Sequence, residues 1–223
     1  MLVTIPKFNN EKLLEQAFIH RSFINENQKT GLEHNERLEF LGDAVLELIV
    51  TECLYKKYKE AAEGELTAYR AGLVNMYSLA KVSSMLGLND KMRLSKGEQR
   101  DDNSKARLSI LADAYEALLG AIYLDRGLEV TKEFVYDTLM PELVDIVKYR
   151  LYKDAKSNLQ ERAQEDMSVT PIYKILKESG PDHSKEFIAG VYLDDVLVAE
   201  GSGQSKHEAE TSAAKEALKV KFK

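Results

Sequence analysis

The sequence lacks the features that mark exported or membrane-bound proteins. Its only cysteine is Cys53, so no internal disulfide can form, and a lone cysteine fits a reducing compartment such as the cytoplasm. No apolar run approaches the length that a bilayer span requires. The first ten residues hold no extended apolar stretch, which argues against a secretory signal. We therefore expect a cytoplasmic protein with no membrane partner.

Positive charge is also scarce. The 223 residues contain 31 lysines and arginines against 37 aspartates and glutamates, which gives a net charge of −6. A protein held to nucleic acid by bulk positive charge is normally basic. Composition alone therefore favours an enzyme that acts on a small molecule. Any binding of nucleic acid must depend on a few well-placed donors, helped by bound cations.

Proline and glycine are rare in the first two thirds of the chain, where they would otherwise interrupt helices. From Glu11 to about Arg150, apolar residues recur at spacings of three and four, which predicts a series of helices. Residues 89–107 are the exception, because they are rich in charged and small polar side chains and indicate a solvated loop. The fold class expected for this part is all-helical.

The pattern changes near residue 150. A polar helix is predicted over residues 154–166, followed by strands of alternating apolar residues, among them Phe187 to Leu193 and Val196 to Ala199. A last helix is predicted from Ser205 to about Lys221. The tail therefore predicts a small α+β module with the element order α-β-β-β-α.

An acidic stripe is the most informative feature of the helical part. In residues 34–48, a turn of about 100° per residue places one apolar set on a single arc, namely Leu38, Leu41, Val45, Leu48 and Ile49. The same rotation places four acids on the opposite arc, namely Glu36, Glu39, Asp43 and Glu47. Like charges four residues apart weaken a helix. A solvated polar face is the simplest explanation, but the absence of lysine and arginine from this face favours a functional one.

A large aromatic side chain stands beside these acids. Phe40 falls outside the apolar arc, and a side chain of this size favours burial. A partner subunit could cover it, and so could another part of its own chain. The residues alone leave both explanations open.

A second pair of acids lies in a helix that is apolar on nearly every side, from Ile110 to Ile122, and such a helix belongs in the interior. Asp113 and Glu116 share one of its faces. A buried carboxylate must be paired, protonated or bound to metal. One explanation is a salt bridge to Arg37 or Arg70. The other is a cation site, and oxygen ligands without paired histidine or cysteine favour Mg²⁺ or Mn²⁺ over zinc.

These stretches resemble the ribonuclease III family. The segment Glu36-Arg-Leu-Glu-Phe-Leu-Gly-Asp43 is similar to the family signature, apart from Ala44 after it, where many members have serine. Three further blocks match in the family's order, namely Leu14–Phe23, Glu63–Thr67 and Leu111–Gly120. The tail resembles a double-stranded-RNA-binding domain, so the resemblance covers almost the whole chain.

The resemblance implies a mainly α protein, with an endonuclease and dimerisation domain in residues 1–149 and a double-stranded-RNA-binding domain in residues 150–223. It implies a homodimer that needs Mg²⁺, for which Mn²⁺ can substitute, and no organic cofactor. The expected activity is cleavage of double-stranded RNA, which leaves 5′-phosphate and 3′-hydroxyl ends with short 3′ overhangs. The expected work is processing of ribosomal RNA precursors, messenger RNA and other RNA duplexes.

The resemblance also implies roles for individual residues. The metal ligands would be Glu39, Asp43, Asp113 and Glu116, of which Asp43 and Glu116 would also be catalytic. Glu36 and Glu63 would assist at the rim of the cleft, and Phe40 would be the dimer contact. Phosphodiester hydrolysis assisted by metal ions needs no protein nucleophile, and none is evident.

Duplex RNA would be contacted by three regions of the tail. They comprise Ser157, Gln160, Glu161 and Gln164 of the first helix, His183 and Ser184 of a loop, and Ser205, Lys206 and His207 at the start of the last helix. Such contacts follow the shape of the duplex more than its sequence. Independently, Ser205 and Glu208 have the spacing of a capping box, which is also typical of ordinary surface helices. His207 stands where many members have lysine, which weakens one expected phosphate contact.

Two other functions compete with this interpretation. A duplex-RNA-binding protein that has lost its chemistry would bind RNA without cutting it, although all four expected metal ligands are present. A helical metalloenzyme acting on small phosphate esters would leave the tail without a purpose.

Overall fold

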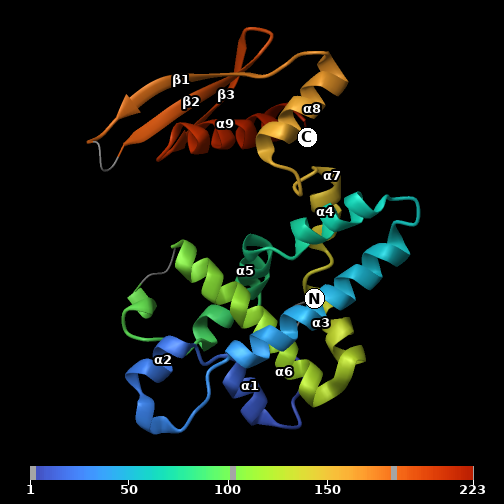
Figure 1. The fold of residues 1–223 in the computed structure, drawn as a ribbon, viewed down its shortest axis with the longest axis vertical. Helices are drawn as coiled ribbons and strands as arrows, with labels where there is room; N and C mark the ends of the chain where they lie inside the picture. Colours follow the sequence, from blue (N-terminus) through green and yellow to red (C-terminus); the bar gives the residue numbers. More distant parts are fainter. Residues whose placement is uncertain (1–3, 101–103, 182–184, 223) are drawn as a thin grey trace. The chain divides into compact units, whose positions relative to one another are not determined.

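The computed structural model describes residues 4–100, 104–181 and 185–222. The chain divides into two compact units, Met1–Val147 and Lys148–Lys223 (Figure 1). The first is built from helices, and the second is a three-stranded sheet with two helices, so the predicted fold class is confirmed. Within the described residues, no helix is long and apolar enough to cross a membrane.

The helices of the first unit follow the periodicity of the sequence. They are α1 (Glu11–Ala17), α2 (Arg21–Glu26), α3 (Glu36–Lys57), α4 (Glu63–Leu73), α5 (Met76–Met85), α6 (Lys105–Thr138) and α7 (Glu142–Lys148), with short 3₁₀ helices at Gln28–Thr30, Leu88–Lys91 and Glu98–Arg100. Gly127 has a φ of 81° and interrupts α6.

The predicted loop over residues 89–107 is wrong in part. It contains both later 3₁₀ helices and the start of α6. The Oγ atom of Ser104 accepts a hydrogen bond from the backbone N–H of Arg107, so the helix begins earlier than composition suggested. Arg107 is itself buried, and its Nε donates to Asn89 at 2.9 Å.

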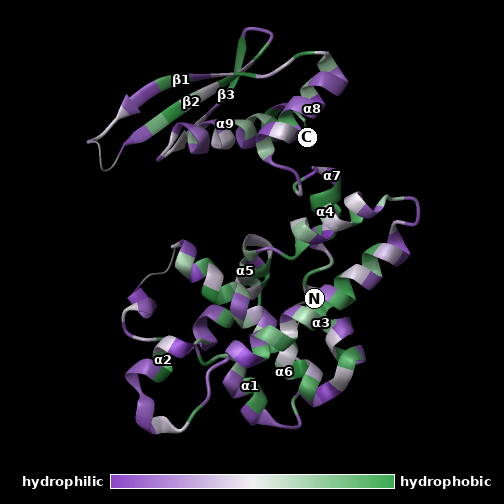
Figure 2. Cartoon of the chain, viewed as in Figure 1, coloured by the Kyte–Doolittle hydropathy of each residue, from purple (hydrophilic) through white to green (hydrophobic). Residues whose placement is uncertain are grey.

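The core of the first unit forms where α3 crosses α6. Tyr115, Leu118 and Ile122 are fully buried, as expected for an interior helix, and Figure 2 shows hydrophobic residues along α6. A Cβ atom on Gly42 of α3 would overlap the carbonyl oxygen of Glu116, and one on Gly120 of α6 would overlap that of Leu38. The two helices therefore touch through their backbones. Glu39, Asp43 and Glu116 all lie within about one turn of this contact.

The start of α3 is held by a buried asparagine. The side chain of Asn35 donates from Nδ2 to the carbonyl oxygen of Ala17 at 3.2 Å, and its backbone N–H donates to that of Ile19 at 2.8 Å. These bonds satisfy polar groups that would be costly to bury unpaired. They also fix the end of α3 from which the acids project.

One predicted core position of α3 is wrong. Leu38, Val45 and Ile49 are buried, but Leu48 is 57 % exposed. The buried face is centred further around the helix, over Gly42 and other residues outside the predicted arc, because the contact with α6 is made there. Leu48 instead lies on the solvent side of α3.

The second unit has the predicted order α-β-β-β-α. Its elements are α8 (Ala155–Met167), β1 (Ile172–Ser179), β2 (Glu186–Leu193), β3 (Val196–Gly203) and α9 (Lys206–Lys221). The antiparallel sheet has the order β1-β2-β3, and both helices cover the same face of it (Figure 1). Asp194 and Asp195 both have positive φ and form the two-residue turn between β2 and β3.

The strand β3 runs past its predicted end at Ala199 and reaches Gly203. Its two last glycines face α9. A Cβ atom on Gly201 would overlap the backbone N of Ala213, and one on Gly203 would meet the first turns of the same helix. Glycine continues this strand because a larger residue would push the helix away.

Candidate functional site

Three carboxylates converge where α3 crosses α6. Glu39 comes from α3, and Asp113 and Glu116 come from one face of α6. Each offers one oxygen atom, and the three oxygens lie within 4.8 Å of one another. The backbone contact at Gly42 and Gly120 is what brings two acidic helices so close. The site therefore consists of oxygen ligands held by rigid elements.

Asp43 lies one turn after Glu39 on the same helix, and its side chain is exposed. It is not among the three residues whose oxygens lie within 4.8 Å of one another. Its negative charge nevertheless helps to raise the pKa of Glu39 and of Glu116. Asp43 therefore borders the cluster from the open side.

The acids destabilise one another's charged forms. Burial, followed by the charges of Asp43 and Asp113, raises the pKa of Glu116 to about 8. Burial and then the charge of Asp113 raise the pKa of Glu39 to about 7. Burial also raises the pKa of Asp113. A divalent cation among these oxygens would remove the repulsion, so the residues present fit a hard cation such as Mg²⁺.

The alternative of a salt bridge to Arg37 or Arg70 does not describe this site. Arg70 instead pairs with Glu47, with its Nε 3.0 Å from Oε2, and donates to the hydroxyl of Thr51. Arg37 is exposed. Across the described part of the chain, no ion pair joins a lysine or arginine to Asp113 or Glu116.

Two basic residues at the site were missed in the sequence analysis. A pocket of about 290 Å³ is lined by His20, Arg21, Asn35, Glu36, Glu39 and Asp113. The Nη1 atom of Arg21 lies 3.3 Å from Oε1 of Glu36, and its charge lowers the pKa of Asp113 in opposition to burial. Burial lowers the pKa of His20, which favours its neutral form. The only signal was their place in the matching block Leu14–Phe23.

The two acids expected at the rim are separated in this single chain. Glu36 lines the acidic pocket beside Arg21. Glu63 is the first residue of α4, accepts a hydrogen bond from the hydroxyl of Thr67 at 3.0 Å, and lines a different pocket of about 220 Å³. The structure therefore brings Glu36 to the carboxylate cluster but does not bring Glu63 there.

An apolar stripe runs along the solvent side of α3. Phe40 is 81 % exposed, Tyr55 is 73 % exposed, and Leu48 lies between them along the helix. Phe40 is therefore not covered by its own chain, which was one of the two explanations left open. Exposed apolar stripes of this kind are typical of interaction surfaces.

The start of α9 has a cap that differs in one bond from the predicted capping box. The Oγ atom of Ser205 accepts from the backbone N–H of Glu208 at 3.2 Å, as expected. Glu208 Oε2 accepts at 2.9 Å from the backbone N–H of Gln204, where a capping box requires that of Ser205. Lys206 and His207 are exposed in the first turn, where backbone N–H groups favour an anion.

The other residues expected to contact RNA lie on α8 and in the loop between β1 and β2. Ser157, Gln160 and Gln164 are exposed on α8. Glu161 is half-buried and forms an ion pair with Lys153, so its carboxylate already has a partner. His183 and Ser184 lie outside the described residues.

Comparisons with known proteins match both units. Residues 10–143 match a family described as Ribonuclease-III-like, and residues 155–221 match the double-stranded RNA binding motif. The Ribonuclease 3 of Desulforamulus reducens is 51 % identical over 95 % of this chain and 86 % of its own length. That of Pelotomaculum thermopropionicum is 50 % identical over 95 % of this chain and 87 % of its own length.

A solved structure is also similar. The nuclease domain of ribonuclease III from Campylobacter jejuni, whose description names a region involved in dimer formation, has a TM-score of 0.54 and 42 % identity. The similarity covers 60 % of this chain and 90 % of that domain.

Proposed function

Because the chain belongs to the ribonuclease III family of endoribonucleases, we propose that it hydrolyses double-stranded RNA at Glu39, Asp43, Asp113 and Glu116, with Mg²⁺ held among them. The observation that carries this proposal is the approach of three carboxylate oxygens to within 4.8 Å on two crossing helices. Asp43 completes the set from the open side. Mn²⁺ prefers the same oxygen ligands and can substitute.

A divalent cation supplies, when bound, a more acidic water and positive charge beside the leaving oxygen. The protein supplies the fixed positions. Glu39, Asp113 and Glu116 are held by helices whose backbones touch, so these carboxylates need little rearrangement to bind an ion. Asp43 and Glu116 are the residues to which we assign the catalytic role. The cleavage products are fragments with 5′-phosphate and 3′-hydroxyl ends and short 3′ overhangs.

Arg21 and Glu36 have a supporting role in this proposal. Both residues of this ion pair line the acidic pocket, which is where a phosphate of the RNA would approach. The guanidinium of Arg21 offers further N–H donors, and arginine is well suited to bind phosphate. The repulsion between an acidic site and an anionic substrate is thereby reduced on one side.

The second unit supplies affinity for the duplex. We assign this role to the exposed residues of α8, namely Ser157, Gln160 and Gln164, together with the first turn of α9 and the loop that contains His183 and Ser184. In this assignment, residues 1–149 form the endonuclease and dimerisation domain, and residues 150–223 bind RNA. The natural substrates are precursors of ribosomal RNA and other RNA duplexes, and the protein acts in the cytoplasm.

The nuclease unit acts as a homodimer through the apolar stripe on α3. We predict that Phe40→Ala weakens dimerisation by roughly tenfold or more, because an exposed aromatic anchor is replaced by a methyl group. Sedimentation at a series of concentrations measures the effect. Tyr77→Ala is the matched control, since Tyr77 is similarly exposed on α5. An unchanged monomer–dimer equilibrium in Phe40→Ala would remove this residue from the interface.

Cleavage of a long RNA duplex with and without Mg²⁺ tests the function. We expect cutting that depends on Mg²⁺ and stops when the ion is chelated. Binding without cutting in the presence of Mg²⁺ would favour a duplex-RNA-binding protein without chemistry. Turnover of a small phosphate ester with no affinity for RNA would favour the helical metalloenzyme.

A further inference from the structure

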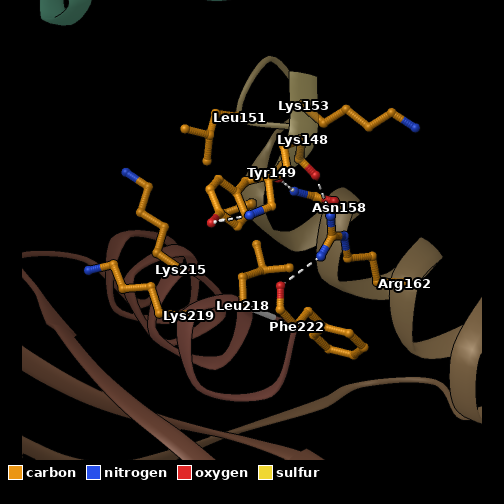
Figure 3. A pocket seen from close by; sticks show the side chains of 11 residues that line it. Lys148, Tyr149, Leu151, Lys153, Asn158, Arg162, Lys215, Leu218, Lys219 and Phe222 are labelled. Atoms are coloured by element: carbon orange, nitrogen blue, oxygen red, sulfur yellow. Dashed lines mark hydrogen bonds between the residues drawn. The ribbon is translucent and has the colours of Figure 1, made fainter. Parts of the chain in front are cut away.

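A pocket in the second unit is lined by none of the predicted RNA-contacting residues. Its volume is about 670 Å³, within the range that holds small ligands. It is formed by the segment before α8, the first turns of α8 and the last turns of α9 (Figure 3). The predicted RNA contacts on α9 are at the opposite end of that helix.

The pocket is positively charged although the protein is acidic. Its lining contains five cationic residues, Lys148, Lys153, Arg162, Lys215 and Lys219, and no acidic residue. Two of the five are paired with acids outside the lining, Lys153 with Glu161 and Lys219 with Glu216. The guanidinium of Arg162 donates to the backbone carbonyl oxygens of Phe222 at 2.8 Å and Lys148 at 2.9 Å, and no carboxylate of the described residues forms an ion pair with it. Lys215 is exposed and has no ion pair among the described residues. An anion would be attracted here.

The wall between these cations is apolar and includes an aromatic ring. Figure 3 shows Tyr149 between Leu151 and Leu218, with the amines of Lys215 and Lys219 on one side and the guanidinium of Arg162 on the other. Leu151 is 59 % exposed, so this surface is open to a ligand. A flat apolar group can pack against such a wall.

A buried amide at the pocket lacks one hydrogen-bond partner. Asn158 lines the pocket and is 1 % exposed. Its Nδ2 donates to the carbonyl oxygens of Tyr149 at 3.0 Å and Arg150 at 3.2 Å, which sets the orientation of the amide. Its Oδ1 is buried and accepts no hydrogen bond within the described residues. Such an acceptor calls for an N–H donor, and because the atom is buried, a donor on a ligand reaches it only when a neighbouring side chain moves aside.

We propose that this pocket binds a nucleotide. Its phosphate would lie at Lys215 and Arg162, its base would pack beside Tyr149, and an N–H group on the base would serve the Oδ1 atom of Asn158. A base paired within a duplex is not available for such contacts. The ligand is therefore either a free nucleotide or an unpaired nucleotide of an RNA strand. This site is lined by other residues than the proposed catalytic cluster and the expected duplex contacts, although its Lys153 pairs with Glu161.

Isothermal titration calorimetry of the full chain, with a chelator present to prevent cleavage, tests the proposal. The titrants are adenosine monophosphate, a short single-stranded oligoadenylate and decanoate, an aliphatic anion without a base. We expect saturable binding of the two nucleotide probes. If both nucleotide probes bind, a free nucleotide is sufficient as the ligand. If only the oligonucleotide binds, the ligand is an unpaired nucleotide of an RNA strand.

Two charge reversals on α9 form a matched pair. Lys215→Glu places an acid at the pocket, and we expect it to weaken nucleotide binding roughly tenfold, as loss of a charge-assisted hydrogen bond does. Lys221→Glu makes the same change on an exposed residue of the same helix that does not line the pocket, and we expect no effect.

Three results would overturn the proposal. They are absence of binding by both nucleotide probes, equal binding by the Lys215→Glu and Lys221→Glu variants, and binding of decanoate as tight as that of the nucleotide probes. Cleavage of duplex RNA is measured separately on the same proteins. The nucleotide site and the proposed nuclease function can therefore fail independently.

Discussion

Both units press a helix against a neighbouring backbone through glycine, but they place charge differently around that contact. In the first unit, Gly42 and Gly120 let α3 touch α6, and acids from both helices meet beside the contact. In the second unit, Gly201 lets β3 touch α9, and the helix faces the sheet with alanines such as Ala213. The close contact at glycine brings acidic side chains together in the first unit, whereas in the second unit it only packs the hydrophobic core.

The difference supports the proposed function of the contact between α3 and α6. Packing alone does not require acids at a helix crossing, and their mutual repulsion raises the pKa of Glu116 and Glu39. A protein under selection for stability alone would not keep this arrangement. The contact between β3 and α9 carries no such penalty, and its charged residues remain at the surface.

The largest effect is expected from Glu116→Gln. The amide removes one negative ligand from the cluster, so cleavage should fall roughly a thousandfold, which corresponds to about 4 kcal/mol. Binding of duplex RNA should be unchanged, because the contacts of the second unit remain. Cleavage rates and gel-shift titrations measure the two properties. Glu133→Gln is the control, since Glu133 is exposed on the same helix; equal activity of both variants would exclude Glu116 from the site.

The two helix contacts can be broken one at a time. Gly42→Ala and Gly201→Ala each force a Cβ atom into backbone, so each should lower the free energy of unfolding by about 3 kcal/mol. Chemical denaturation measures the loss. Only Gly42→Ala should also reduce cleavage beyond its effect on stability, because only that contact positions acids. Gly64→Ala is the control, because nothing lies within 4 Å of its added Cβ.

The pH dependence of stability should separate the two units. Glu39 and Glu116 have raised pKa values when folded, about 7 and about 8, so the folded state keeps protons that the unfolded state releases. The stabilisation from these groups is therefore full below their ordinary pKa of 4.5 and is lost as the pH rises through about 8.

Mg²⁺ should oppose this loss, because it binds the ionised carboxylates of the folded state. We expect saturating Mg²⁺ to stabilise the first unit by about 2 kcal/mol at high pH and much less at low pH. Thermal unfolding at about pH 5 and about pH 9 measures the effect. The Glu116→Gln variant should respond less. An equal response of this variant and the unaltered protein would contradict the assignment.

The smallest effect is expected at the start of α9. Lys206→Ala removes one exposed cation from the first turn of the helix, so duplex binding should weaken by about 1 kcal/mol, and the salt dependence should fall by about one phosphate contact. Lys221→Ala removes an equal charge from the last turn and serves as the control. Identical affinities for the two variants would place the duplex elsewhere on this unit.

Most of the fold was accessible from periodicity, because the helices and strands bury continuous apolar faces. Asp113 and Glu116 stood out because charged residues are unusual within an apolar helix. Leu48 was assigned wrongly because the pattern identifies which residues are apolar but not where the neighbouring helix lies. The early start of α6 depends on one local cap at Ser104, which composition does not reveal.

The contacts between distant segments were the least predictable. Arg21 approaches Glu36 because the backbone N–H of Asn35, before α3, donates to the carbonyl oxygen of Ile19, before α2, and no spacing in the sequence records that approach. The pocket beside Tyr149 arises because the chain before α8 lies against the end of α9. Its cations are spread over more than seventy positions and form no motif, since Lys148 and Lys219 meet only after folding.

The glycine contact between α3 and α6 also has a consequence for selectivity. Helices whose backbones already touch cannot move closer, and the tightly packed core around them resists moving apart. The main chain therefore fixes the spacing of the Cα atoms that carry the carboxylates, and only side-chain rotation can adjust the oxygens to an ion. A cage of this kind suits a compact cation with short bonds to oxygen, whereas Ca²⁺ has longer bonds and takes more ligands. In the proposed site, ionic radius would then decide which metal is accepted more than affinity for negative charge would.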